Sequence, residues 1–158
     1  MKNRINICLA ESIDLPLILD LQKECYRQEA EIYNDFNIPP MLQTLDALKI
    51  EWQNGTVLIA VKNGQIVGSV RALLDTNICK IGKLIVKPDF QNQGIGKNLM
   101  KAIEMRFNEC LVYELFTGSE SEKNLALYRK LGYRDCRKES VNQNMSLIFL
   151  QKQNVVTS

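Results

Sequence analysis

The N-terminal part of the chain changes from strand-like to helix-like spacing of its apolar residues. Apolar and polar residues alternate over residues 4–9, which predicts a half-buried strand. Residues 29–40 end in Ile-Pro-Pro and are not expected to continue a helix, because proline disfavours helical geometry in the residue before it. A second short helix is predicted over residues 44–53. Between residue 9 and residue 29, Ser12 or Asp14 can cap a helix whose apolar stripe consists of Leu17, Ile18, Leu21 and Cys25.

The middle of the chain predicts three successive strands joined by tight turns. Residues 56–61, 66–74 and 78–86 are rich in Val, Ile and Leu. The dipeptide Asn63-Gly64 lies between the first two of these segments and is a strong hairpin signal. Pro88 ends the third segment. The pattern therefore predicts an antiparallel meander.

The rest of the chain predicts a helix over residues 95–107, a strand over 111–117, a helix over 122–131 and a final hairpin of strands near 133–138 and 144–151. Ser119 and Glu122 are spaced for a capping box, and residues 154–158 are expected to be frayed. The order β-α-α-β-β-β-α-β-α-β-β predicts one domain over residues 1–158. Its class is α/β (α+β), a mixed, mostly antiparallel sheet flanked by helices.

Composition narrows the function classes. The net charge of +2 is too small, and its basic residues too scattered, to favour nucleic acid as a partner. Five dispersed cysteines, without a secretory leader or an apolar segment that could span a membrane, favour reduced packing residues in a cytoplasmic protein. The sequence contains no histidine, which excludes Ser-His-Asp and Cys-His catalysis and His-ligated zinc. No metal is expected.

The glycine-containing loop before the third predicted helix is the best candidate for a ligand site. Gly94 and Gly96 lack side chains, so that a ligand can approach the backbone closely. The first turn of the following helix leaves N–H groups without partners, and its dipole favours negative charge. A dinucleotide fingerprint would need glycine in place of Leu99, and a Walker A loop would need glycine in place of Gln91. The loop alone predicts either an anion site or a plain turn.

Two longer segments resemble the GCN5-related N-acetyltransferases, the GNAT family. Residues 81–100 resemble its motif A, which is an apolar strand, a Pro-containing turn and then Q/R-x-x-G-x-G/A at the start of a helix. Residues 122–133 resemble its pattern N-x-x-A/L-x-x-x-Y-x-K-x-G-F/Y. The resemblance implies the GNAT fold, an acyltransferase activity and acetyl-CoA as the co-substrate.

The resemblance also implies which residues hold the cofactor. In this family the strand before the loop splays from its neighbour, and its backbone pairs with the pantetheine arm; here that is Leu84, Ile85 and Val86. The backbone N–H of Leu84 or Ile85 would hold the developing oxyanion. The pyrophosphate would meet the loop residues Gln91, Asn92, Gln93, Gly94, Ile95, Gly96 and Lys97. The side chain of Lys97 either adds a charged contact or stays solvated.

The second motif supplies the proposed proton donor. Asn124 and Tyr128 lie four residues apart and so share one helix face. By resemblance, Asn124 contacts the pantetheine, and Tyr128 contacts the cofactor and donates a proton to the departing CoA thiolate. The alternative for Tyr128 is packing beside Leu131. Lys130 either reaches the nucleotide phosphate or neutralises the C-terminus of the helix.

The sequence departs from the family where a general base is expected. Many members carry a glutamate on the strand before the loop, whereas this chain has Lys83 and Lys87 there. A lysine cannot act as a base unless burial lowers its pKa. Other candidates for the base are polar residues near site-forming segments, each of which can equally be solvated surface: Glu29, Glu31, Tyr33 and Glu114.

The two motifs concern the cofactor and do not identify the acceptor substrate. The family shapes its acceptor site with the first two helices and their connection, here residues 24–44, with Tyr26, Tyr33, Phe36, Ile38 and Met41. We expect direct transfer to the primary amine of a small molecule, in preference to a protein amine. The alternative is a non-catalytic acyl-CoA sensor or partner module, which the missing glutamate favours. The resemblance also implies a homodimer, because the family often dimerises.

Overall fold

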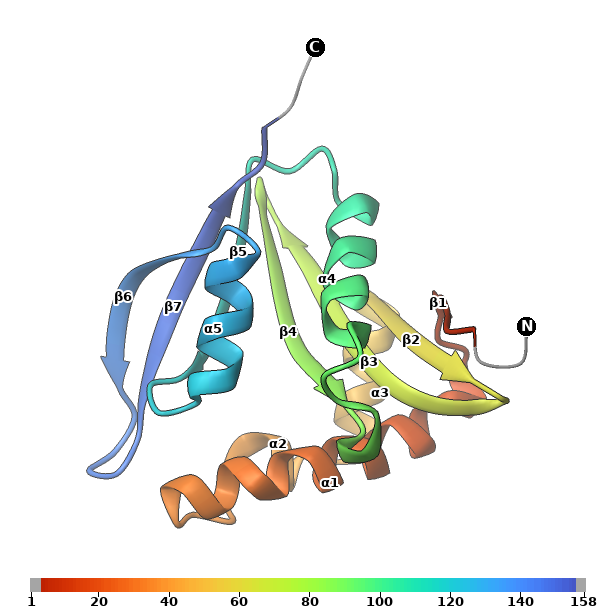
Figure 1. Cartoon of the computed structure of the whole chain (residues 1–158), viewed down its shortest axis with the longest axis horizontal. Coiled ribbons are helices and arrows are strands. Elements are labelled where there is room, and N and C mark those ends of the chain that lie inside the picture. The colour runs from red at the N-terminus through yellow and green to blue at the C-terminus, as the bar shows by residue number, and fades with distance from the viewer. Residues whose placement is uncertain (1–3, 156–158) are drawn as a thin grey trace.

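The computed structural model describes residues 4–155, so residues 1–3 and the last three residues of the predicted tail, 156–158, lie outside the description. Its centre is one seven-stranded sheet of order β1-β2-β3-β4-β5-β7-β6 (Figure 1). All neighbours are antiparallel except β4 and β5, which are parallel, so that the predicted sheet type is confirmed. The strands are β1 (Asn6–Leu9), β2 (Thr56–Lys62), β3 (Gln65–Asp75), β4 (Ile78–Val86), β5 (Val112–Gly118), β6 (Arg134–Ser140) and β7 (Ser146–Gln153).

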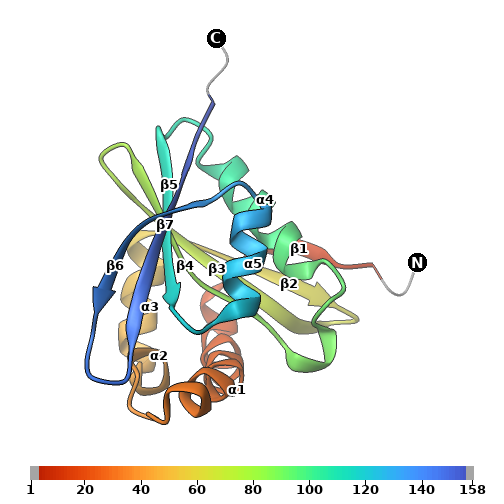
Figure 2. The ribbon, with the colours of Figure 1, turned by 60° about the vertical axis from the view of Figure 1, so that its left-hand side comes forward.

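Helices cover both faces of this sheet (Figure 2). Helices α1 (Leu15–Tyr33), α2 (Pro39–Leu42) and α3 (Leu45–Asn54) lie on one face. Helices α4 (Ile95–Arg106) and α5 (Glu122–Lys130) lie on the other. One-turn 3-10 helices precede α1 at Ser12–Asp14 and α4 at Pro88–Phe90. None of the helices described within residues 4–155 is both long and apolar enough to cross a membrane.

Strand β2 shows why the central strands are almost continuously apolar. Successive side chains of a strand point to opposite faces. Leu58 and Ala60 are buried in the core beneath α4 and α5, whereas Val57 and Ile59 are buried in a second core beneath α1 and α3. Because both faces are covered, the alternation of a one-sided strand is absent. The predicted hairpin after β2 is confirmed, with positive φ at Asn63 (52°) and Gly64 (76°).

Helix α1 is longer than the sequence predicted. It continues through residue 29 to Tyr33 and ends at Asn34, which has the left-handed φ of 51°. Ala30 and Tyr33 are buried, and tertiary packing therefore supports the additional turn. The stripe prediction was wrong at Leu17, whose side chain is exposed. The Pro-Pro pair does not exclude a helix either: Pro39 begins α2, because proline is tolerated in a first turn.

Three smaller predictions were also wrong. The Ser119–Glu122 capping box does not form; Ser121 precedes α5, and its hydroxyl donates to Glu29 on α1. The start of the tail is anchored, because the Asn154 side chain donates to the carbonyls of residues 108 and 110, both at 2.7 Å. The cysteines are not all packing residues: Cys79 and Cys110 are buried, but Cys8 and Cys136 are exposed.

The strands β4 and β5 pair only at one end. Their parallel register covers Ile78↔Val112, Cys79↔Tyr113 and Lys80↔Glu114, and no later pair is formed. Beyond Lys80, β4 pairs only with β3, while β5 pairs only with β7. The strands therefore diverge, as Figure 1 shows. A β-bulge at Lys83, which has a φ of 51°, adds local twist to β4 just after the divergence begins.

Arg71 on β3 ties the three helices of one face to the sheet. Its guanidinium donates to the side chain of Gln22 on α1, to that of Gln43 after α2 (3.1 Å) and to Glu51 on α3 (3.0 Å). The side chain is only 7% exposed, so these charge-assisted hydrogen bonds act in a poorly solvated environment. This cluster fixes the helices that face the divergent strands.

Tyr33 links the end of α1 to the end of β5 and the loop that follows it. Its hydroxyl accepts a hydrogen bond from the backbone N–H of Glu120 at 2.8 Å. The ring packs directly on Gly118, where an added Cβ would lie 2.1 Å from the hydroxyl oxygen. Glycine is therefore required at this position by close approach.

We predict that Gly118→Ala lowers the free energy of unfolding by about 1–3 kcal/mol, since Tyr33 must move and overpacked cores lose about this much. Equilibrium urea denaturation followed by circular dichroism measures the change. Gly82→Ala is the control, because an added Cβ there meets no atom within 4 Å, and it should leave the midpoint almost unchanged. Equal midpoints for the two variants would contradict the packing argument.

Candidate functional site

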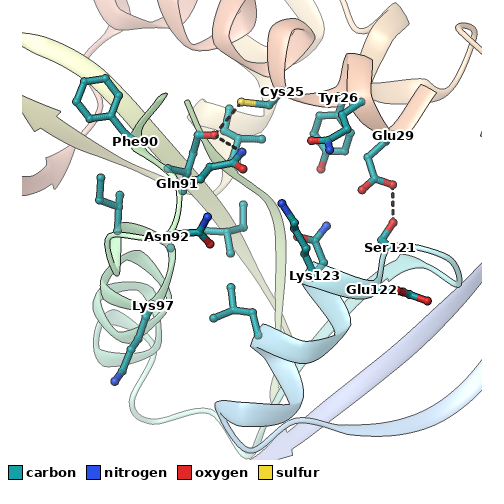
Figure 3. Close-up of a pocket in the computed structure, with 18 of the residues that line it drawn as sticks. Cys25, Tyr26, Glu29, Phe90, Gln91, Asn92, Lys97, Ser121, Glu122 and Lys123 are labelled. Atoms are coloured by element: carbon teal, nitrogen blue, oxygen red, sulfur yellow. Dashed lines mark hydrogen bonds between the residues drawn. The ribbon is translucent and has the colours of Figure 1, made fainter. Parts of the chain in front are cut away.

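A cleft of about 450 Å³ opens where β4 and β5 diverge, between α1, α4 and α5 (Figure 3). Its walls come from the C-terminal half of α1, the end of β4, the glycine-containing loop and the first turn of α5. Most of the predicted cofactor residues line it, namely Leu84, Ile85, Val86, Gln91, Asn92, Gly94, Ile95, Gly96, Lys97 and Asn124. The fold thus brings the two sequence motifs to one cavity.

The loop presents backbone N–H groups to this cleft. Asn92 and Gly94 have left-handed φ values of 63° and 83°, which turn the chain sharply before α4. Within the described part of the chain, no hydrogen-bond acceptor is recorded for the N–H groups of residues 92–97. Unpaired N–H groups at the start of a helix favour an anion. A Cβ at Gly96 would contact Leu127 at 3.6 Å and Val86 at 3.7 Å, so that a side chain there would enter the cleft.

The free edge of β4 forms the floor of the cleft. The carbonyl of Val86 accepts from the Gln91 side chain at 3.0 Å and from the Cys25 thiol at 3.4 Å. Burial raises the pKa of Cys25 to about 12, so that its thiol keeps its proton and is a poor nucleophile. Lys123, from the first turn of α5, reaches toward the middle of the cleft, whereas Lys97 points away from the other labelled side chains (Figure 3).

A second cavity of about 630 Å³ lies on the other side of the same gap. It is enclosed by α1, α2, α3, the bulged part of β4 and the β6–β7 turn. Its walls are mainly apolar, but Arg71, Lys83 and Glu51 also contribute. The two cavities meet at a junction that we define by the residues lining both of them, Tyr26, Glu29, Leu84 and Asn124.

Tyr128 faces the second cavity next to this junction. The residue is 6% exposed, and its ring also packs against Tyr133 at a centroid distance of 6.1 Å, so that it is both a core and a cavity residue. Burial raises the pKa of Tyr128, and the nearby groups of Tyr26 and Glu29 raise it further. The phenol therefore keeps its proton at neutral pH. No hydrogen bond from its hydroxyl is recorded among residues 4–155.

Glu29 is the only one of the four candidate bases that lines either cavity. It lies on α1 at the junction and accepts a hydrogen bond from Ser121 (2.5 Å), as Figure 3 shows. Tyr33 instead has a packing role, and Glu31 is exposed outside both cavities. Glu114 pairs with Arg137 at 3.7 Å and with Gln151 at 2.6 Å.

Several predicted positions fall outside the cavities. Gln93 and Lys130 line neither cavity. Lys130 is the last residue of α5, whereas the junction residue Asn124 is in its first turn. This position favours the alternative in which Lys130 neutralises the C-terminus of the helix. On the acceptor side, Tyr26 and Ile38 line the second cavity, but Tyr33, Phe36 and Met41 do not. Sequence reasoning missed Lys123, Ser121 and Arg71, because only the tertiary fold brings them to the site.

Within residues 4–155, no three His, Cys, Asp or Glu side chains are grouped so that they could hold a metal ion. The two cavities bring together unpaired backbone N–H groups, the free edge of β4, a buried phenol and several carboxylates, of which only Glu29 lines both cavities. A family model described as an acetyltransferase (GNAT) domain matches residues 24–153. The chain belongs to the GNAT family. The resemblance drawn from the two motifs is confirmed, and with it the acyltransferase class.

Solved structures share the fold of this GNAT protein across almost its whole length. The ribosomal-protein-S18-alanine N-acetyltransferase of Escherichia coli has a TM-score of 0.81 at 14% identity and covers 98% of this chain and 97% of its own. The PaiA N-acetyltransferase of Thermoplasma acidophilum, solved with coenzyme A, has a TM-score of 0.82 at 18% identity, with coverage of 95% and 99%. YncA of Salmonella typhimurium, solved with acetyl-CoA, has a TM-score of 0.75 at 17% identity, with coverage of 99% and 97%.

The similarity to a curated sequence is more limited. A UPF0039 protein of Schizosaccharomyces pombe is 29% identical over 90 residues, which are 56% of this chain and 60% of the yeast protein. This chain therefore spans less than two thirds of that relative. The match of the family model to residues 24–153 shows the family. The solved structures are less than 25% identical in sequence, and their similarity to this chain shows the fold.

We predict that Gly96→Asp weakens coenzyme A binding by more than about tenfold, because the new carboxylate enters the anion cradle. Asn98→Asp is the matched control, since Asn98 is exposed in the same helical turn and lines neither cavity. Titration calorimetry with coenzyme A measures both variants. If Asn98→Asp weakens binding as much as Gly96→Asp, the anion site is not at the cleft that we describe.

Proposed function

We propose that this protein transfers the acetyl group of acetyl-CoA to the primary amine of a small molecule by direct attack. The observation that carries the proposal is the junction, where a cleft with an anion cradle meets a second, mostly apolar cavity of about 630 Å³. A co-substrate in the first cavity and an acceptor in the second would meet at one point. Holding two reactants in contact is a large part of catalysis of group transfer.

In this proposal acetyl-CoA is bound by residues that the two sequence motifs predicted. When bound, acetyl-CoA supplies an activated acetyl thioester. The N–H groups of residues 92–97 bind its pyrophosphate, the free edge of β4 pairs with its pantetheine arm, and Asn124 orients the arm near the junction. Leu84 lies at the junction just after the bulge, so its backbone N–H is the donor that we propose for charge on the acetyl oxygen.

Two side chains divide the proton transfers between them. Glu29 accepts a proton from the acceptor amine, because an alkylamine is mostly protonated at neutral pH and must lose a proton to attack. Tyr128 holds a proton for the leaving sulfur, and the burial that raises its pKa keeps it protonated until that step. In this proposal the base comes from α1 instead of β4, so that the missing glutamate on β4 does not by itself favour a non-catalytic sensor.

Purified protein with acetyl-CoA and a panel of small amines and short peptides tests this function through the release of free coenzyme A. We expect turnover with small amines that exceeds turnover with peptides. Tight acetyl-CoA binding without turnover on any amine would favour the sensor instead. Failure to bind acetyl-CoA would overturn the whole proposal.

We predict that Tyr128→Phe lowers kcat by about 100-fold or more, because general acid catalysis typically contributes at least this factor. The affinity for acetyl-CoA should stay within about threefold, since Phe keeps the packing of the ring. Tyr133→Phe is the matched control: it removes a neighbouring hydroxyl, which donates to Glu104 at 2.8 Å and lines neither cavity. Equal loss of kcat in both variants would leave Tyr128 with a packing role only.

We predict that Glu29→Gln lowers kcat/KM at pH 7 by about 100-fold and that the loss shrinks as the pH rises. The sign follows from the substrate: without a base, only amine that has already lost its proton reacts, and its fraction increases with pH up to the amine pKa. A kcat/KM profile between pH 6 and 10 measures this. Glu31→Gln, on the exposed side of α1, should retain the wild-type profile. A Glu29→Gln profile parallel to that of the wild type would exclude Glu29 as the base.

A further inference from the structure

Among residues 4–155, the second cavity is lined by one cation for which no ion pair is recorded. Arg71 pairs with Glu51 at 3.0 Å, and Lys80 pairs with Asp75 at 3.2 Å. Lys83 lines the same cavity, but no ion pair or hydrogen bond of its ammonium group is recorded within residues 4–155. The protein therefore places an unpaired positive charge among mostly apolar walls.

The position of Lys83 is set by the bulge in β4. This residue has a φ of 51°, which non-glycine residues seldom adopt, and its side chain is half-buried. Burial lowers the pKa of Lys83; the carboxylate of Glu51 opposes this effect, and the guanidinium of Arg71 reinforces it. An isolated charge in such surroundings is costly unless a partner compensates it. A bound anion would supply that partner.

The other charges of the cavity indicate how a ligand would be oriented. Glu29 lies at the junction and lines both cavities, whereas Lys83 lines the second cavity but not the cofactor cleft. Glu51 and Arg71 contribute further charges to the wall of the second cavity. Glu29 and Lys83 therefore both line the second cavity, and of the two only Glu29 also lines the cofactor cleft. The apolar part of the cavity wall includes Ile81, Leu115 and Leu147.

We propose that the acceptor is an amino acid, with its amine at Glu29, its carboxylate paired with Lys83 and an apolar body between or beside them. This inference depends on the proposed acetyl transfer and names the class of its acceptor. Each charged end of such a ligand meets the opposite charge, and the apolar walls cover the remainder. An amine without a carboxylate would leave Lys83 unpaired.

Arg71 is not the carboxylate site, although it is also a cation in the cavity wall. Its terminal nitrogens are occupied by Gln22, Gln43 and Glu51, and its unpartnered Nε is fully buried. Replacing Arg71 would remove hydrogen bonds to α1, to Gln43 after α2 and to α3. No side-chain hydrogen bond or ion pair of Lys83 is recorded within residues 4–155, so its substitution would break no such contact.

The test compares matched acceptors. Leucine, phenylalanine and 6-aminohexanoate are each assayed beside their methyl esters, which keep the amine and lose the negative charge. We expect kcat/KM to be at least about tenfold higher for the free acid in at least one pair, which is the scale of one charge-assisted contact. In Lys83→Met this ratio should fall below about three, because methionine keeps the length of the side chain without the charge.

Two controls separate the possible failures. Lys80→Met removes a cation of the same cavity that is already paired, so it should retain the wild-type ratio. Acetyl-CoA affinity of Lys83→Met reports whether that variant is folded. If acids and esters react equally in every pair, or if Lys80→Met lowers the ratio as much as Lys83→Met, the amino-acid inference is wrong while acetyl transfer stands. If no amine reacts at all, the proposed function itself is wrong.

Discussion

The incomplete pairing of β4 with β5 is the constraint on which the site depends. Three residue pairs at Ile78, Cys79 and Lys80 hold the strands together, after which each strand pairs only with its other neighbour. A continuous ladder would use the free edge of β4 for the protein itself and would close both cavities. The bulge at Lys83 twists β4 within the divergent part. One irregularity in a sheet thus opens a strand edge, a cofactor cleft and an acceptor cavity.

The divergence is useful only because the surrounding elements are held firmly. Arg71 binds the three helices of one face through buried charge-assisted hydrogen bonds, and Tyr33 fixes the end of α1 against Gly118. Glu29 therefore keeps its place at the junction, although it lies near the end of a long helix. Rigid support for a reacting group is what preserves its geometry through turnover.

The acceptor cavity has a carboxylate from α1, Glu29, and an ammonium group from β4, Lys83. Acid–base work that other members of the family assign to a glutamate on β4 is proposed here for Glu29 on α1, so that β4 is free to carry Lys83. A cation close to the reacting amine would oppose catalysis, because it disfavours a protonated acceptor. In the wall of the second cavity, the same cation is proposed to favour an acceptor that carries a carboxylate.

The sequence alone determined the order of the strands and of the longer helices, the sheet type, the Asn63-Gly64 hairpin and the glycine-containing turn before α4, since these depend on local periodicity and turn chemistry. It also placed Asn124 and Tyr128 on one helix face. It could not determine that α1 extends to Tyr33, because buried contacts far along the chain support that turn. Nor could it select Glu29 from four candidate bases, find Arg71 or separate Lys83 from Lys87. Those distinctions depend on contacts between residues that lie far apart in the sequence, and only tertiary packing decides which of them meet.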